Sequence, residues 1–306
     1  MSGLDSLLQR VAQFGNKWSP EVKAECEKIF TVQQKLEFSE ERAASVQVVK
    51  GLKYGPHERH RLDVYAPKAA YGKRPVIVYI HGGAFVAGDN DISEYFHSNI
   101  GYFFASQGYV CILATYRLLP EARYPDGADD VARAVEWIKG TIADYGGAAN
   151  NIHVIGQSAG GAHLAMALFT SRVASNALSS AIFLSAPFQY DLQIPRRRTN
   201  MFQYYGTEDE AVVNNQTSVA LFRQSDWGQE TAEESPKIVV MVGQYDSEEI
   251  LGANFAFLEE YRGKMNSMPL FETMEGHNHI SYALAIGLSG ERLGGRILEI
   301  VKAISS

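Results

Sequence analysis

The sequence predicts an α/β fold with a mostly parallel eight-stranded sheet and helices on both faces. Short β-rich runs alternate with helical stretches from Ser45 onward, which is the order expected of such a sheet. The central runs, such as residues 76–80, are apolar throughout, as strands buried on both faces are. With 306 residues, 46% of them hydrophobic, the chain can bury the core of one large domain with an accessory cap.

Eight strands and five helices are predicted from this alternation. The strands are expected at residues 45–49, 62–65, 76–80, 110–114, 152–155, 181–184, 238–242 and 270–273. The helices are expected near residues 93–106, 128–139, 159–171, 248–262 and 291–304.

The first part of the chain carries helical spacing and no strand pattern up to about Phe38. We therefore divide the chain into a helical N-terminal arm or cap (residues 1–44) and a main α/β domain (residues 45–306). The stretch 189–231 is polar and irregular between two strands, which is typical of a lid or cap-like insertion. Its Arg196, Arg197 and Arg198 are expected in a solvated loop. Its aromatic residues either line an acyl or aryl pocket or pack the cap: Phe188, Tyr190, Phe202, Tyr204, Tyr205 and Trp227.

Composition excludes several classes of function. The formal net charge is −7, and the basic residues form no stripe that could follow a phosphate backbone, so we expect no nucleic-acid partner. The apolar runs are too short to span a bilayer, and the start of the chain lacks a basic segment followed by an apolar one. We expect a cytoplasmic protein without a membrane partner. Cys111 is interpreted as a buried thiol and Cys26 as part of a charged helix.

A candidate nucleophile lies between a strand and a helix. The pentapeptide Gly156-Gln157-Ser158-Ala159-Gly160 follows the run 152–155 and opens the next helix, which is the context of the G-x-S-x-G nucleophile elbow. A sharp strand-to-helix turn requires small residues two positions before and two after the serine, where strand and helix approach each other. Ser158 is therefore the predicted nucleophile.

A glycine pair follows the strand 76–80, in the segment His81-Gly82-Gly83-Ala84-Phe85. Glycines at a strand end leave backbone N–H groups free to point into a cleft. The N–H groups of Gly82, Gly83 and Ala159 are the predicted donors to an oxyanion, which forms as an acyl carbon becomes tetrahedral. His81 is expected to shape this loop, and His163 to pack on the helix after Ser158.

Several ordered motifs resemble one family, the hormone-sensitive-lipase-like esterases of the α/β-hydrolase superfamily, in the branch with kynurenine formamidases and small carboxylesterases. The similarity covers the chain from about Tyr54 onward. It rests on residues 62–67 (LDVYAP), 81–85 (HGGAF), 116–121 (YRLLPE) with 124–125 (YP) and 129–131 (DDV), and 156–161 (GQSAGG), together with two C-terminal segments. Ala84 stands where many relatives have a third glycine. The resemblance implies the α/β-hydrolase fold and a serine esterase.

This fold places the catalytic residues in the order serine, acid, histidine. Asp246 follows the strand 238–242 and matches the catalytic acid of the family, whereas Glu248 and Glu249 are expected to begin the next helix. Only His277 and His279 come after Asp246. The family segment has glycine, two variable residues, histidine and an apolar residue. That pattern implies His279 as the base, with His277 exposed or supporting the loop.

The expected reaction is cleavage of a small carboxylic ester through an acyl-enzyme intermediate. One alternative is an arylformamidase acting on N-formylkynurenine-like substrates, and another is a non-catalytic ligand-binding protein of the same fold. Motifs for a zinc, redox-disulfide or nucleotide site are absent, so we expect no metal and no cofactor. The expected partner is a small acyl substrate. The sequence leaves the oligomeric state open, a homodimer included.

Overall fold

The computed structural model describes residues 3–68, 72–93, 95–228 and 235–305. Their strands form one eight-stranded sheet in the order β1-β2-β4-β3-β5-β6-β7-β8. Strand β2 is antiparallel to β1 and to β4, and every other pairing is parallel. The strands are β1 (Val46–Lys53), β2 (Arg61–Pro67), β3 (Arg74–Ile80), β4 (Val110–Ala114), β5 (Gly147–Gln157), β6 (Ser180–Leu184), β7 (Lys237–Gly243) and β8 (Leu270–Met274).

All eight predicted strands are confirmed, with ends that differ by a few residues. The helices that connect and cover them are α1 (Gly3–Phe14), α2 (Pro20–Leu36), α3 (Glu40–Ser45), α4 (Ser98–Ser106), α5 (Asp126–Thr141), η1 (Ile142–Tyr145), α6 (Ala159–Phe169), η2 (Ser175–Ala177), α7 (Pro195–Tyr205), α8 (Glu210–Asn215), α9 (Ser218–Gln224), α10 (Glu248–Met265), α11 (Ser281–Ala285) and α12 (Leu293–Ser305). The five predicted helices correspond to α4, α5, α6, α10 and α12. Helix α4 starts later than predicted, at Ser98, and residue 94 of the predicted range lies outside the described residues.

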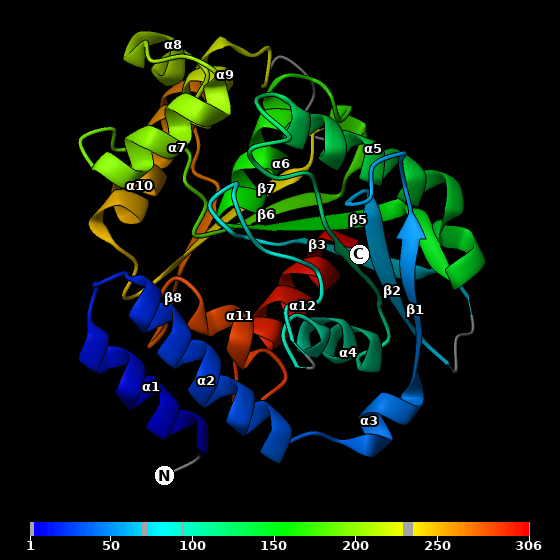
Figure 1. Cartoon of the computed structure of the whole chain (residues 1–306). Coiled ribbons are helices and arrows are strands. Elements are labelled where there is room, and N and C mark those ends of the chain that lie inside the picture. Colours follow the sequence, from blue (N-terminus) through cyan, green and yellow to red (C-terminus); the bar gives the residue numbers. More distant parts are fainter. Residues whose placement is uncertain (1–2, 69–71, 94, 229–234, 306) are drawn as a thin grey trace.

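Two hydrophobic cores lie on the two faces of the sheet because side chains alternate along each strand. In β3, Val76 and Val78 pack with α5, α6, α9 and α10. Ile77 and Tyr79 point to the other face, where α4, α11 and α12 pack together with α1 and α2. The sheet is therefore covered on both sides, which explains why its central strands are apolar throughout (Figure 1).

The N-terminal helices pack against the C-terminal part of the chain. Helices α1 and α2 lie side by side next to α11 (Figure 1). Val11, Cys26 and Phe30 are fully buried there. The side chain of Gln34 donates to the carbonyl oxygens of Leu284 and Ile286, at 2.8 and 3.0 Å. The arm is thus anchored directly to the segment that follows β8.

The insertion between β6 and β7 is helical rather than irregular. It contains α7, α8 and α9, which gather above the sheet next to α10 (Figure 1). The prediction of a loop for the three arginines was wrong, because they form the first turn of α7, whereas the predicted solvent exposure holds for Arg196 and Arg198. Arg197 makes an ion pair with Glu249 of α10 at 2.7 Å, and Arg198 one with Glu210 of α8 at 3.0 Å. Residues 229–231 of the predicted insertion lie outside the described residues.

Among the described residues, no helix combines the length and the apolar composition that crossing a membrane requires.

Candidate active site

The sharp turn between β5 and α6 places Ser158 at the carboxyl edge of the sheet. Ser158 has φ +49° and ψ −121°, a conformation that residues with a side chain rarely adopt. The turn is possible because glycines flank it. A Cβ at Gly156 would lie 2.5 Å from the Cα of Gly161, and one at Gly160 would lie 2.3 Å from the carbonyl oxygen of Ile80. The hydroxyl of Ser158 therefore projects from a rigid, strained turn.

His279 lies between β8 and α11, within hydrogen-bond distance of both other candidates. Its Nδ1 is 2.7 Å from Oδ1 of Asp246, and its Nε2 is 2.8 Å from the hydroxyl oxygen of Ser158. An ionised carboxylate can only accept, so the Nδ1–H donates to Asp246 and leaves Nε2 to accept from the hydroxyl. The structure thus brings together Ser158, His279 and Asp246, which lie far apart in the sequence.

Asp246 is fully buried in the loop after β7. Its second carboxylate oxygen, Oδ2, accepts a hydrogen bond from the backbone N–H of Gly243 at 2.7 Å and from the hydroxyl of Ser185 at 2.6 Å. The neighbouring carboxylates Glu248 and Glu249 begin α10, as predicted. Sequence reasoning missed Ser185. The available signal was its position directly after β6, beside the strand that carries the acid.

The loop after β3 lies against the nucleophile. A Cβ at Gly82 would lie 3.1 Å from the Cβ of Ser158, so the backbone of Gly82 closely approaches the reacting hydroxyl. Within the described part of the chain, no backbone hydrogen bond uses the N–H of Gly82 or Gly83. The N–H of Ala159, in the first turn of α6, has no intrahelical partner. The predicted donors Gly82 and Ala159 therefore lie next to Ser158, and Gly83 follows Gly82 in the same loop.

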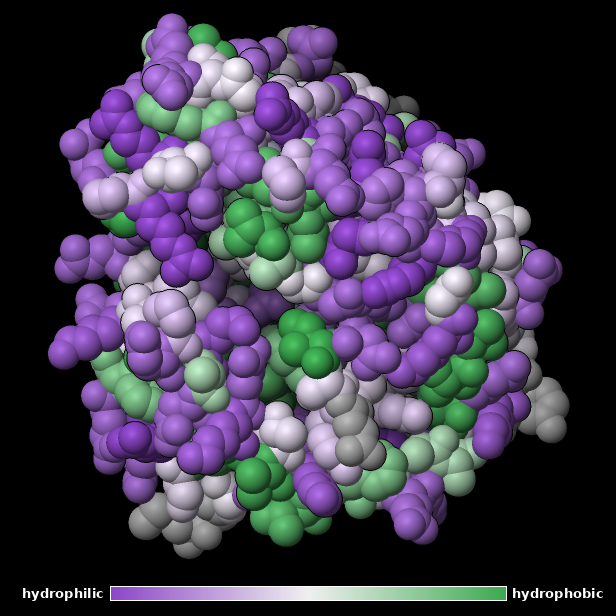
Figure 2. Space-filling model, viewed as in Figure 1, coloured by the Kyte–Doolittle hydropathy of each residue, from purple (hydrophilic) through white to green (hydrophobic). Residues whose placement is uncertain are grey.

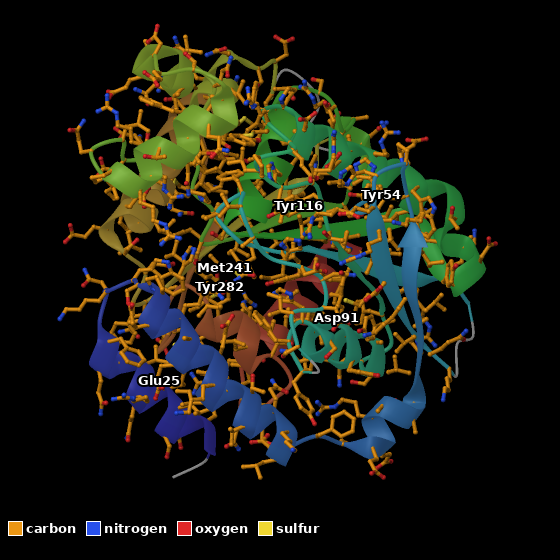
Figure 3. All side chains as sticks on the ribbon, in the orientation of Figure 1. Glu25, Tyr54, Asp91, Tyr116, Met241 and Tyr282 are labelled. Carbon is orange, nitrogen blue, oxygen red and sulfur yellow. The ribbon has the colours of Figure 1, made fainter. Side chains whose placement is uncertain are left out.

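His81 holds this loop in place. Its Nδ1 lies 2.7 Å from the carbonyl oxygen of Gly82, and its ring stacks on Tyr116 with centroids 4.5 Å apart. The hydroxyl of Tyr116 donates to the carbonyl oxygen of His81 at 2.9 Å. Burial lowers the pKa of His81 to about 3, so the ring is neutral at pH 7 and its Nδ1–H donates to the carbonyl. Tyr116 is labelled beside this loop in Figure 3.

His277 is buried rather than exposed. Its Nδ1 lies 3.1 Å from the hydroxyl of Ser281, and its carbonyl oxygen accepts from the N–H of Tyr245 at 2.8 Å. His277 therefore supports the loop by joining it to the segment that carries Asp246. Burial lowers the pKa of His277 to about 4. His163 is also buried, with its ring edge-on to Phe85 at 5.0 Å.

The N-terminal arm reaches the site, a feature that the sequence did not reveal. The ring of Trp18, between α1 and α2, lies against the ring of His279 with centroids 5.1 Å apart. The side-chain amide of Asn278 donates to the sulfur of Cys26 in α2 at 3.4 Å. Figure 2 shows that this face of the molecule is hollowed between the surface over the arm and the surface over the cap helices.

Three of the predicted aromatic residues show which parts of the chain the insertion contacts. Phe188 stacks on Phe257 of α10 with centroids 4.0 Å apart, and Trp227 contacts Phe169 of α6. These residues pack the cap. The ring of Tyr204 instead contacts the ring of Phe85, with centroids 4.6 Å apart. Phe85 belongs to the loop that carries the predicted oxyanion donors Gly82 and Gly83. The insertion therefore reaches the edge of the site as well as its own core.

A separate hollow of about 620 Å³ lies at the opposite edge of the sheet. Its lining includes Lys237 at the start of β7 and Leu270 at the start of β8. Ser158, His279 and Asp246 do not line it. Ligand sites of parallel sheets form at the carboxyl ends of strands. The candidate site is therefore the hydrogen-bonded group around Ser158, not this hollow.

Comparison with known proteins agrees with the fold and identifies the family. Esterase B from Lactobacillus rhamnosis has a similar structure, with a TM-score of 0.74 at 16% identity, covering 98% of this chain and 97% of the other. The esterase of Pyrobaculum calidifontis has a TM-score of 0.68 at 19% identity, with 98% of both chains covered. These structures support the α/β-hydrolase fold that the sequence predicts.

Curated relatives match shorter segments. The isoprenylcysteine alpha-carbonyl methylesterase of Arabidopsis thaliana is 30% identical over 166 residues, which cover 54% of this chain and 38% of the relative. Esterase LipC of Mycobacterium tuberculosis is 36% identical over 119 residues, or 39% of this chain and 29% of the relative. The chain thus matches well under half the length of these relatives. A family model described as BD-FAE matches residues 62–244, more than half of the chain. The chain therefore belongs to the BD-FAE family.

Proposed function

We propose that this protein is a serine hydrolase that cleaves a small carboxylic ester through an acyl-enzyme intermediate. The observation that carries the proposal is the continuous hydrogen-bond chain from the Ser158 hydroxyl through His279 to Asp246. The matched relatives named as esterases support the same reaction class. In this proposal residues 45–306 form the catalytic domain, and the arm (residues 1–44) and the insertion (residues 189–231) cap it.

In the first half-reaction, Oγ of Ser158 attacks the acyl carbon while its proton moves to Nε2 of His279. Asp246 stabilises the resulting imidazolium through the Nδ1–H. The N–H groups of Gly82, Gly83 and Ala159 stabilise the negative oxygen of the tetrahedral intermediate. The intermediate then releases the alcohol, which takes the proton from Nε2, and leaves Ser158 acylated.

The second half-reaction returns the free enzyme. Water attacks the acyl carbon and gives its proton to Nε2 of His279, and the same N–H groups stabilise the second tetrahedral intermediate. When this intermediate collapses, the proton returns to Oγ of Ser158 and the carboxylic acid leaves. This cycle uses only the side chains and N–H groups of the chain and one water molecule, so the proposed reaction requires no cofactor.

The test uses purified protein with a panel of p-nitrophenyl esters and a fluorophosphonate probe. We expect turnover of esters and stoichiometric labelling at Ser158, both of which Ser158→Ala abolishes without changing the circular dichroism spectrum. Activity of Ser158→Ala within about tenfold of wild type would remove Ser158 from the mechanism. N-formylkynurenine in the same panel separates the arylformamidase alternative. Absence of labelling in folded protein would indicate a non-catalytic ligand-binding protein.

A further inference from the structure

Ser185 occupies an unusual backbone position beside the proposed catalytic acid. It directly follows β6, and its N–H donates to the carbonyl oxygen of Met241 in β7 at 2.8 Å. Ser185 has φ +51°, in the left-handed region that glycine adopts without steric cost and other residues rarely enter. A serine that is held in this conformation suggests a function for its side chain.

The side chain of Ser185 is fully buried and points at Asp246. Its hydroxyl donates to Oδ2 of that carboxylate at 2.6 Å. The N–H of Gly243 donates to the same oxygen at 2.7 Å. Both donors therefore bind Oδ2, and Oδ1 is left to accept from His279. The hydroxyl of Ser185 thus fixes how the Asp246 carboxylate is rotated about its Cβ–Cγ bond.

The charge of Asp246 makes this contact important. Within the described ranges, His279 is the only ion-pair partner of Asp246, and the carboxylate has no exposed surface. A buried carboxylate needs donors to remain ionised. Before the proton moves, His279 is neutral in the proposed cycle, so its contact with the carboxylate is then a hydrogen bond and not an ion pair. The hydroxyl of Ser185 supplies one of the two donors to Oδ2.

We propose that Ser185 is a positioning residue of the active site: its hydroxyl holds the Asp246 carboxylate turned so that Oδ1 orients His279 toward Ser158. This inference rests on the proposed function. Ser185 does not touch the reacting atoms in this scheme and acts through Asp246. Loss of the hydroxyl lowers the rate of the chemical step, because His279 spends less time in the orientation that accepts the proton.

The experiment compares Ser185→Ala, Ser185→Gly and Ser185→Cys in the full chain. Alanine and glycine both remove the hydroxyl, but glycine also relieves the backbone strain at this position. We expect both variants to lower kcat for p-nitrophenyl acetate by about tenfold or more, with KM within about twofold, while Ser185→Gly unfolds at a higher temperature than Ser185→Ala because it relieves the strain. Ser185→Cys retains a weak donor and is expected to fall between wild type and Ser185→Ala.

The matched control is Ser180→Ala at the other end of β6. Ser180 is also fully buried, and its hydroxyl lies 2.8 Å from Nδ1 of His153. It belongs to the same strand that Ser185 follows, but lies at the end away from the proposed triad. We expect Ser180→Ala to lower the unfolding temperature and to leave kcat within about twofold. If Ser180→Ala lowered kcat as much as Ser185→Ala, the effect would belong to packing of the strand and the proposal would be wrong.

A proton NMR signal provides a readout that does not depend on turnover. The strongly deshielded proton between Nδ1 of His279 and Oδ1 of Asp246 is expected in wild type and in Ser180→Ala, and shifted or broadened in Ser185→Ala and Ser185→Gly. An unchanged signal together with unchanged kcat would overturn the positioning role. If wild type neither hydrolyses esters nor reacts with the fluorophosphonate, the proposed function fails instead, and the NMR signal alone decides whether Ser185 orients the pair.

Discussion

The ring of Trp18 lies edge-on to the ring of His279, with centroids 5.1 Å apart and planes at 69°. Trp18 remains 40% exposed, so the N-terminal arm presents an accessible indole beside the proposed base. Such an aromatic contact contributes about 0.5–1.5 kcal/mol beyond burial. The arm therefore packs an aromatic ring against His279 and leaves part of that ring accessible to solvent.

We expect Trp18→Ala to lower kcat/KM for p-nitrophenyl esters by about twofold to tenfold, and Trp18→Phe to retain most of the activity, because phenylalanine keeps a ring beside His279. The control is Phe38→Ala, which removes another exposed aromatic residue just after α2, one that contacts Tyr95 instead. Equal kinetics for Trp18→Ala and wild type would show that the indole is not needed by the base or the substrate.

The two neighbouring histidines should behave differently when replaced. His279→Ala removes the ring that joins Ser158 to Asp246, so we expect kcat/KM to fall about a thousandfold or more. His277→Ala removes a buried hydrogen bond to Ser281 and should lower the unfolding temperature while costing little activity. Steady-state kinetics and thermal unfolding of both variants decide the assignment. An inactive His277→Ala beside an active His279→Ala would reverse it.

The proposed site should favour esters with a short acyl chain. Tyr204 of the insertion packs against Phe85 of the compact loop after β3, so the aromatic insertion and the loop with the predicted oxyanion donors are joined. We therefore expect esters of short acids to be hydrolysed with higher kcat/KM than esters of long-chain acids, without a lipid interface. The measurement is kcat/KM for p-nitrophenyl esters of increasing acyl length. A steady rise through the long chains would contradict this picture of the cleft.

Gly160 and Gly140 form a matched pair of helical glycines. A Cβ at Gly160 would lie 2.3 Å from the carbonyl oxygen of Ile80, whereas one at Gly140, in α5, would meet nothing within 4 Å. Gly160→Ala should therefore distort the turn at Ser158, lower the unfolding temperature and lose activity. Gly140→Ala should instead stabilise the protein by about 0.5–1 kcal/mol. Both replacements add the same methyl group, so a difference in their stability must come from the surroundings of the added Cβ. Chemical denaturation of both variants measures that difference.

Stability should fall steeply on mild acidification. Burial lowers the pKa of five histidines to about 3 or 4: His81, His97, His153, His163 and His277. Their stabilising contribution is present above the unfolded value of about 6.5 and is lost as the pH falls toward the folded values. Below pH 6.5, each such ring lowers the free energy of unfolding by about 1.4 kcal/mol per pH unit. Glu291 acts in the opposite direction, because burial raises its pKa to about 7.

The measurement is the free energy of unfolding in urea at several values between pH 7 and pH 5. We expect it to decrease as the pH falls. His163→Phe removes one titrating ring and should reduce the decrease between pH 7 and pH 5 by about 2 kcal/mol in total. A free energy of unfolding that stays constant over this range would mean that the native protein takes up protons at these rings as readily as the unfolded chain does.

The sequence by itself determined the sheet and the candidates for chemistry. Strands that are buried on both faces must be apolar throughout, so runs such as residues 76–80 were visible without coordinates. The turn around Ser158 was visible because its backbone geometry demands glycines at fixed spacing. The order of Ser158, Asp246 and His279 along the chain narrowed the remaining choices. Their catalytic roles stay predictions until the variants are measured.

Only the tertiary structure decided which residues surround these candidates. Ser185 contacts Asp246 and Trp18 contacts His279 across long sequence separations, and no local periodicity encodes such contacts. The arginines of α7 were misjudged for the same reason, since the partner of Arg197 lies in α10. The position of His277 likewise depends on a distant segment, because its carbonyl oxygen accepts a hydrogen bond from the N–H of Tyr245. Local sequence determines backbone conformation, whereas burial, charge pairing and the orientation of a reacting group depend on how distant segments pack together.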